Sequence, residues 1–262
     1  DLRSQKTVVS VIIPSYNGAK YIKDAIDSVL SQNVSLEIIF INDFSNDNTD
    51  EIMEEYIKKY DNIVYLKNKK SLGVSKTRNK GVALAKGKYI AFLDVDDFWE
   101  AGKLMKQINL LEKNNAVFSY TGRELITDSG KSTGRVISVP EKIDYTELLK
   151  KNLIPCSSVV LLKSVAEEFP MERDSLHEDY LNWLMILRKY NMAYGINKPL
   201  LKYRLTPKGK SRNRFKSAVM TYRVHRELKT NVFLSLYYTL SHLLNGIKKY
   251  SLGSRKGEKN EL

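Results

Sequence analysis

The stretch that most constrains this chain is Lys88–Trp99, where an apolar run leads directly into three carboxylates. Its first part, Tyr89–Leu93, is typical of a strand that is buried on both faces. Asp94, Asp96 and Asp97 follow at once, although carboxylates this close together repel one another and are costly to bury. Mg²⁺ or Mn²⁺ would remove that cost, because both ions prefer oxygen ligands. We therefore predict a metal–phosphate site at the carboxyl end of a central strand, with a solvated acidic loop that caps the next helix as the alternative.

Strands and helices alternate through the first half of the chain. Apolar, β-branched runs predict strands at residues 8–13, 36–41, 63–66 and 89–93. Helical periodicity predicts helices at residues 19–32, 50–60 and 101–114, and another that ends near Gly87. This alternation predicts an α/β fold with a mostly parallel sheet, in which ligands bind outside the carboxyl ends of the strands. Polar clusters follow three strands, and we expect them to meet in one crevice. They lie at residues 14–17, 42–47 and 94–97.

The pattern becomes mixed beyond residue 114. Strands are predicted at residues 116–127, 132–139, 157–162, 194–196 and 200–204, with a short helix at 144–152. A helix with a strong apolar stripe opens with Glu178 and Asp179, where carboxylates are favoured by the helix dipole, so simple capping is the alternative to a functional role. We predict one domain over residues 1–205, with a nucleotide-binding half at 1–100 and an acceptor half at 101–205.

The charge of the chain is concentrated at its C-terminal end. The chain carries a formal charge of +13, and residues 202–262 hold 15 Lys/Arg against three Asp/Glu, which leaves the first 201 residues near neutral. Residues 215–250 are predicted to form one or two amphipathic helices, and the last ten or so residues are predicted to be disordered. A basic tail over 206–262 suits peripheral contact with an anionic membrane. A solvated basic face and a dimerisation helix pair that forms a homodimer are the alternatives.

Composition and motifs narrow the class of protein. A single cysteine, Cys156, excludes an internal disulfide framework and fits a reducing compartment. The N-terminus lacks a secretory signal pattern, and no run approaches the roughly 18 apolar residues of a spanning helix. We therefore expect a cytoplasmic protein that is peripheral on the inner face of the cell membrane. The basic charge of the chain makes nucleic-acid binding an alternative function. However, the sequence contains no recognisable nucleic-acid-binding motif, and its first 201 residues are near neutral. We therefore expect no nucleic-acid partner.

Five segments in this order resemble the family 2 glycosyltransferases over about residues 7–205. They are 9–17 (VSVIIPSYN), Asn42-Asp43 with Ser45, Asp47 and Thr49, Leu72-Gly73 with Arg78-Asn79, Leu93–Asp97, and Glu178-Asp179. The resemblance implies a GT-A fold and inverting transfer of a sugar from a nucleotide-sugar donor, with a divalent metal, Mn²⁺ or Mg²⁺, as cofactor. The acceptor would be a glycan or lipid-linked hydroxyl in surface polysaccharide synthesis. A partner subunit that binds nucleotide sugar without catalysis is the alternative.

The resemblance also implies roles for residues of the first half. Pro14, Tyr16 and Asn17 match the turn where the nucleobase stacks on the aromatic ring. Asp43 matches the acid that reads the imide edge of uracil, which favours UDP. Arg78 matches a cation near the base and the diphosphate. For Asp43 a plain turn residue is the alternative, and for Arg78 a surface residue on a helix.

The acidic stretch matches the family's DxD motif. In that pattern Asp96 ligates the metal, while Asp94 contacts the ribose or a metal-bound water, so both count as metal-site residues. Val95 stands between them in the donor site, and Asp97 supports their surroundings. Val95 and Phe44 stand where smaller residues are common in the family.

The remaining implied roles lie on the acceptor side. Asp179 matches the general base, and Glu178 stands beside it. Arg204 and the basic segment at 208–212 resemble a late segment that can close over the diphosphate. Trp99 is either a core residue or part of the acceptor wall.

Overall fold

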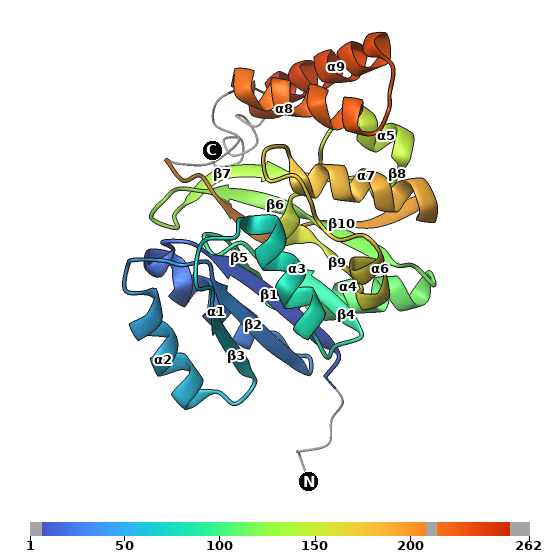
Figure 1. Ribbon diagram of the computed structural model, residues 1–262. Helices are drawn as coiled ribbons and strands as arrows, with labels where there is room; N and C mark the ends of the chain where they lie inside the picture. Colours follow the sequence, from blue (N-terminus) through green and yellow to red (C-terminus); the bar gives the residue numbers. More distant parts are fainter. Residues whose placement is uncertain (1–6, 208–213, 252–262) are drawn as a thin grey trace, which may run out of the picture.

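The computed structural model of the protein describes residues 7–207 and 214–251 (Figure 1). In these ranges the strands are β1 (Val9–Ser15), β2 (Leu36–Asn42), β3 (Ile63–Lys67), β4 (Tyr89–Phe92), β5 (Phe98–Trp99), β6 (Phe118–Ile126), β7 (Ser132–Ile137), β8 (Lys142–Asp144), β9 (Val160–Leu162) and β10 (Met192–Arg204). The helices are α1 (Ile22–Leu30), α2 (Thr49–Lys59), α3 (Val74–Leu84), α4 (Lys103–Lys113), α5 (Tyr145–Lys150), α6 (Lys163–Glu168), α7 (Glu178–Tyr190), α8 (Arg214–Glu227) and α9 (Val232–Ser251). Two short 3₁₀ turns cover Ala19–Tyr21 and Cys156–Ser158.

The first four strands form the predicted parallel arrangement, in the order β3-β2-β1-β4. Their register pairs Ser15 of β1 with Asn42 of β2, and Ile12 of β1 with Phe92 of β4. The carboxyl ends of β1, β2 and β4 therefore lie at one edge of the sheet, and the polar segments that follow them start close together. Pro14 was predicted to end the first strand, but β1 continues through it to Ser15, because the fixed φ of proline suits an extended end position.

Residues 101–205, which the sequence predicts to be an acceptor half, add antiparallel strands to this sheet. Strand β9 pairs antiparallel with both β4 and β6, and β10 runs parallel to β6. The two predicted closing strands are one strand, β10, whose register shifts between Ile196 and Leu201. Strands β5 and β8 and helix α6 were not predicted, because each is at most six residues long and its own sequence shows no clear periodicity.

Helices cover both faces of the sheet. One buried apolar cluster packs α1, α2 and α4 against one face through side chains such as Val11 and Phe40. The other packs α3, α5, α6 and α7 against the opposite face through Ile12 and Ile39, their neighbours in the chain. This alternation along β1 and β2 is the two-residue period of a doubly covered sheet, and it explains why apolar residues of both strands point to both faces.

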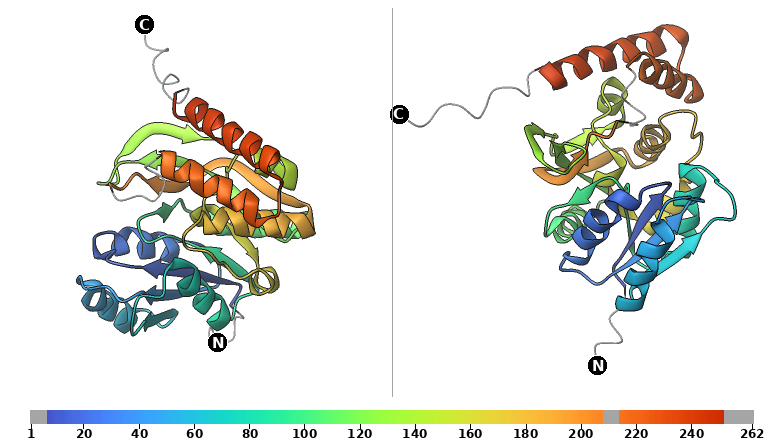
Figure 2. Two further views of the ribbon diagram at one scale, coloured as in Figure 1. Left: turned by 45° about the horizontal axis from the view of Figure 1, so that its top comes forward. Right: turned by 90° about the vertical axis from the view of Figure 1, so that its left-hand side faces the viewer.

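Helices α8 and α9 form a hairpin that lies outside α5 and α7, at the end of the molecule remote from β3 (Figures 1 and 2). The predicted amphipathic helices are thus confirmed. Within residues 7–207 and 214–251, no helix combines the length and the hydropathy that crossing a membrane requires. The predicted basic segment 208–212 and the predicted disordered end lie outside the described residues.

Candidate active site

The turns after β1 and β2 are joined by hydrogen bonds, as their predicted convergence requires. The backbone N–H of Asn17 donates to Ser45 Oγ (2.9 Å), and the N–H of Asn46 donates to Asn17 Oδ1 (2.9 Å). Asn17 has φ = 52°, a left-handed conformation that asparagine tolerates better than most residues. The turn that presents Tyr16 is therefore held by the neighbouring strand end, and the Tyr16 ring is 60% exposed.

Asp43 is buried and is the centre of a loop-holding network. Its carboxylate accepts hydrogen bonds from the backbone N–H groups of Leu72 (2.8 Å) and Gly73 (3.0 Å) and from the side chains of Asn68 (2.8 Å) and Ser71 (2.9 Å). Burial alone would raise the pKa of Asp43, but these four hydrogen bonds lower it below its ordinary value. A carboxylate has about four acceptor directions. Asp43 therefore holds the loop before α3 in place. To hydrogen-bond directly to a nucleobase, its carboxylate would first have to lose one of these four bonds.

Arg78 connects the two halves of the site. Its guanidinium group, on α3, lies 2.5 Å from Asp94 Oδ1 and 3.1 Å from Glu178 Oε1, and the side chain is almost fully buried. The sequence did not predict this bridge, because 100 residues separate Arg78 from Glu178. It brings the acidic end of β4 next to the first turn of α7. Glu178 is thus an ion-pair partner of a buried cation, which simple helix capping does not explain.

Burial perturbs the acids that follow β4. It raises the pKa of Asp96 to about 6, and the charge of Asp94 adds to this effect. Burial and the charges of Asp96 and Asp94 also raise the pKa of Asp97 well above its ordinary value. Asp97 accepts a hydrogen bond from Ser157 Oγ (2.6 Å), and Ser157 Oγ in turn accepts one from the N–H of Asp94 (3.0 Å). Asp97 thus holds the loop in place from its buried side.

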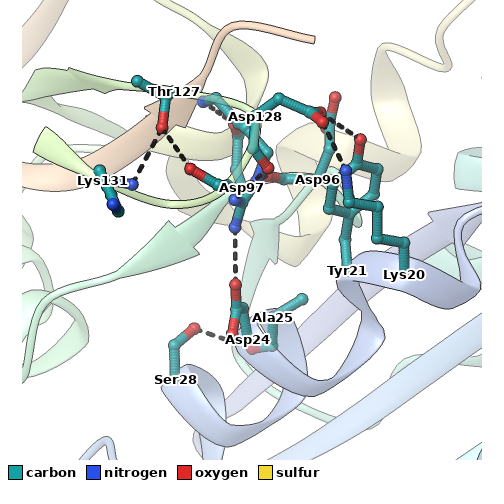
Figure 3. Close-up of polar contacts among 12 residues, drawn as sticks. Lys20, Tyr21, Asp24, Ala25, Ser28, Asp96, Asp97, Thr127, Asp128 and Lys131 are labelled. Carbon is teal, nitrogen blue, oxygen red and sulfur yellow. Dashed lines mark hydrogen bonds and ion pairs between the residues drawn. The ribbon is translucent and has the colours of Figure 1, made fainter. Parts of the chain in front are cut away.

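Arg204, at the end of β10, ties this loop to the rest of the site. Its backbone N–H donates to Asp97 Oδ1 (2.9 Å), and its guanidinium group donates to Asp96 O (2.7 Å), Asp128 O (2.9 Å) and Asp24 Oδ2 (2.7 Å). Figure 3 shows Asp24 and Asp128 on either side of this network, with Tyr21 donating to Asp128 (2.5 Å). The sequence assigned no role to Asp24, and Asp128 lies between the predicted strands at residues 116–127 and 132–139.

Asp179 lies on the first turn of α7, where the helix was predicted to open. Burial and the adjacent charge of Glu178 raise its pKa to about 7, against a lowering effect of Arg78. The N–H of Tyr180 donates to Asp179 Oδ1 (2.7 Å). A carboxylate of this pKa is protonated in part at neutral pH and is suited to accept a proton. We call Asp94, Asp96, Asp97, Glu178 and Asp179 the acidic cluster.

Other predicted residues take supporting positions. Trp99 is buried and donates from Nε1 to Ser157 O (2.8 Å), so it belongs to the core behind the acidic loop and does not form an exposed acceptor wall. Val95 lies against the turn after β1, because a Cβ on Gly18 would come within 2.6 Å of Val95 Cγ1. Cys156 is buried, as expected for a small apolar residue. Phe44 lies in the turn after β2. Its side chain is 51% exposed, and its backbone φ is 70°.

The acidic cluster is compatible with a divalent cation that is held jointly with a substrate. Among residues 7–207 and 214–251, no group of three or more His, Cys, Asp or Glu residues could hold a metal ion alone. Asp94 and Asp96 supply two carboxylates, and the pKa of Asp96 is raised mainly by burial and secondly by the negative charge of Asp94. Mg²⁺ commonly takes one or two carboxylates and completes its ligand set with substrate phosphates. The donor set therefore fits such an ion.

Comparison with known proteins identifies the family. The sequence profile of glycosyl transferase family 2 matches residues 10–168. The chain belongs to this family. It is 35% identical over 246 residues to the putative teichuronic acid biosynthesis glycosyltransferase TuaG of Bacillus subtilis, covering 93% of this chain and 98% of that protein. It is 36% identical over 256 residues to the UDP-Glc:alpha-D-GlcNAc-diphosphoundecaprenol beta-1,3-glucosyltransferase WfgD of Escherichia coli, covering 96% and 98%. The predicted family and glycosyltransferase activity are confirmed.

Solved structures show the same fold. TarS of S. aureus in complex with UDP-GlcNAc superposes with a TM-score of 0.70 at 17% identity, covering 95% of this chain and 74% of that one. The mannosyltransferase PcManGT of Pyrobaculum calidifontis, in complex with GDP-Man and Mn²⁺, superposes with a TM-score of 0.69 at 13% identity. The match covers 97% of this chain and 77% of that one. The GT-A fold predicted for this glycosyltransferase is therefore confirmed.

Proposed function

We propose that the protein is an inverting glycosyltransferase that moves a sugar from a UDP-sugar to a hydroxyl of a lipid-linked or glycan acceptor in bacterial surface polysaccharide synthesis. The Arg78 bridge carries this proposal, because it joins Asp94 to Glu178, the neighbour of Asp179. A candidate donor-binding acid and a candidate base thereby belong to one site. The names of the two relatives support the setting, since one refers to teichuronic acid and the other to UDP-Glc and a diphosphoundecaprenol acceptor.

On the donor side, we assign nucleobase stacking to the exposed ring of Tyr16, in the turn formed with Pro14 and Asn17. Asp43 would shape the uracil pocket through the loop that it holds, and would read the base where one of its hydrogen bonds opens. We assign Arg78 to the bridge and not to direct contact with the diphosphate, because its side chain is buried.

Asp96 and Asp94 would hold the divalent cation, Mn²⁺ or Mg²⁺, and such an ion supplies Lewis-acid stabilisation of the departing diphosphate. The structural neighbour that contains Mn²⁺ supports this choice of ligand class. The loop that carries Asp94 and Asp96 would be kept in place by hydrogen bonds within the protein, which involve Asp97, Ser157 and Arg204.

On the acceptor side, we assign Asp179 as the general base. A sugar hydroxyl is a poor nucleophile, and a carboxylate that accepts its proton during attack typically accelerates such a step by ~10²–10⁴-fold. The glycosyl centre passes through an oxocarbenium-like transition state, and attack from the face opposite the leaving group inverts it. The pKa of Asp179, about 7, fits a base that works near neutral pH. Glu178 raises that pKa while it holds Arg78.

We further propose that residues 1–205 form the catalytic domain, and that the basic tail at 206–262 makes peripheral contact with the inner face of the cell membrane. The charge of the tail supports this placement, since residues 202–262 hold 15 basic and three acidic side chains. An acceptor carried on a lipid would require the enzyme to work at that surface.

The proposal is tested with a thermal-shift panel of UDP, UDP-glucose, UDP-GlcNAc and GDP-mannose, with Mn²⁺ or with a chelator. A ligand that binds only the folded state raises the melting temperature by mass action. We expect UDP compounds with Mn²⁺ to raise it, and the chelator or Asp96→Asn to remove the shift. Asp61→Asn, an exposed acid in a loop after α2, is the matched control and should retain it. If UDP compounds raised the melting temperature equally in the presence of the chelator and in Asp96→Asn, that result would contradict the proposed donor site.

A further inference from the structure

Helix α9 faces the protein with its polar side. His242 Nε2 lies 2.9 Å from the Tyr180 hydroxyl and 3.0 Å from Leu149 O, and Ser241 Oγ donates to Lys150 O (3.0 Å). Leu149 and Lys150 are the last residues of α5, so side chains of α9 satisfy carbonyl groups that the end of a helix leaves without partners. The inner side of α9 is therefore fixed by polar contacts, with Tyr238 also packed against the core.

The opposite side of α9 is apolar and faces solvent. Phe233 is 85% exposed, Leu236 is 54% exposed and Leu240 is 56% exposed, and Tyr237 and Leu244 are similarly open. These five residues, which we call the outer stripe, recur at intervals of three and four and thus line one helix face. A surface helix of a soluble protein normally turns its apolar side inward. In α9 the orientation is reversed, because the apolar face points to solvent. Such an exposed apolar face indicates contact with a partner or a membrane.

The charge around the outer stripe indicates what covers it. Residues 214–251 contain seven Lys/Arg and one acidic residue, Glu227, which pairs with Arg173 (2.7 Å). Arg223, Arg226 and Lys229 are exposed near the turn between α8 and α9. A second copy of the chain would bring two strongly basic tails together, and their charges would repel. An anionic lipid surface matches both features, because its acyl region accepts apolar side chains and its headgroups attract cations.

We propose that α9 lies flat in the headgroup region of an anionic bilayer and inserts the outer stripe. This inference rests on the proposed membrane contact and specifies the face and the lipid that it uses. The inner side of α9 contacts Tyr180, which follows Asp179 on α7, so the docked helix and the acceptor half are one packed unit. The enzyme would thus meet a lipid-linked acceptor from the side that carries its base.

The test is co-sedimentation of the full chain with vesicles of phosphatidylglycerol and phosphatidylcholine, and with vesicles of phosphatidylcholine alone. We expect binding to the anionic vesicles that weakens at high salt. The triple variant Phe233→Ser/Leu236→Ser/Leu240→Ser should bind on the order of 1000-fold more weakly, because each of the three inserted side chains contributes roughly a tenfold factor. These side chains are exposed, so the variant should keep the wild-type melting temperature.

A matched control removes exposed apolar side chains elsewhere, as Val64→Ser/Leu84→Ser/Met105→Ser on β3, α3 and α4. It should bind vesicles like the wild type. Equal binding of the triple variant, or no wild-type binding to anionic vesicles, would overturn the proposal. So would a wild-type dimer in light scattering that the triple variant dissociates, because a second copy would then cover the stripe. The UDP thermal shift without vesicles is measured on the same samples, so a failed donor site is distinguished from a failed docking surface.

Discussion

Replacing Asp179 by asparagine should stabilise the protein at neutral and higher pH while it removes catalysis. The side chain is partly buried, and its pKa is raised from 3.8 to about 7 by burial and by Glu178. Between these two values the unfolded chain has released the proton and the folded protein has not. Folding is therefore penalised progressively as pH rises through this window, and the penalty is constant above it. Asparagine never ionises, so the variant escapes the penalty.

The size of the effect follows from the shift. About three pKa units correspond to ~4 kcal/mol at most, since each unit is worth ~1.4 kcal/mol. Partial exposure and coupling to Glu178 reduce this, so we expect ~2 kcal/mol in favour of Asp179→Asn at pH 8 and almost none at pH ~4. For a chain of this size that gain raises the melting temperature by roughly 4–8 °C. Turnover should fall by ~10²–10⁴-fold, because the proposed general base is lost.

Glu178→Gln is the matched control, since it is also isosteric and one residue away. It should destabilise the protein, by ~2 kcal/mol, because it removes one of two carboxylates from the buried Arg78. It should also lower the pKa of Asp179, so the acidic limb of the pH–rate profile should move to lower pH. The assays are urea unfolding across pH and release of UDP with acceptor present. Equal stability of wild type and Asp179→Asn at pH 8, or retained turnover, would refute the reasoning.

Three further substitutions test separate parts of the structure. Phe44→Gly should leave stability unchanged or raise it by up to ~1 kcal/mol, because φ = 70° strains a bulky residue, while the UDP titration should show weaker binding if the exposed ring contacts the base. Ser157→Ala should cost ~1–3 kcal/mol in urea unfolding, because Asp97 loses a buried hydrogen bond and the Asp94 N–H loses its acceptor. Lys103→Met should stabilise by ~2 kcal/mol near pH 7, because Lys103 Nζ is buried over the Trp99 ring with no hydrogen-bond partner among the described residues. Burial lowers the Lys103 pKa, so this gain should shrink as pH rises toward ~10, and a gain that is constant with pH would contradict that cause.

The donor half could be predicted from sequence because its signals are local. Each of its strands is a continuous apolar run, and each polar cluster follows its strand directly, so parallel alternation alone places Tyr16, Asp43 and Asp94 at one edge. The start of α7 at Glu178 was equally local, because carboxylates precede an apolar stripe. These predictions needed no knowledge of contacts between distant residues.

The long-range contacts that complete the candidate site had no local signal in the sequence. Arg78 reaches Glu178 across 100 residues, and Arg204 reaches Asp24 across 180. Asp174, in the loop before α7, accepts a hydrogen bond from the N–H of Ser75 at the start of α3 (2.8 Å). Each of these pairs depends on how β9 and β10 are inserted into the sheet, and short or bulged strands leave that choice to tertiary packing. The outward side of α9 was likewise hidden, because periodicity shows two faces without telling which is buried.

The charge balance of the site gives the strongest physical argument for a cation. The acidic cluster has five carboxylates near two buried guanidinium groups, that of Arg78, which pairs with Asp94 and Glu178, and that of Arg204, which also pairs with Asp24. Burial and mutual repulsion raise the pKa values of Asp96 and Asp179, which indicates that the protein alone does not neutralise the cluster. A nucleotide diphosphate would bring further negative charge to the same edge of the sheet. Under the proposed function, a UDP donor would need added positive charge to bind there, and oxygen ligands would select a hard divalent ion for that purpose. We therefore expect UDP binding to be lost without a divalent metal, because of the same charge imbalance that contributes to these raised pKa values.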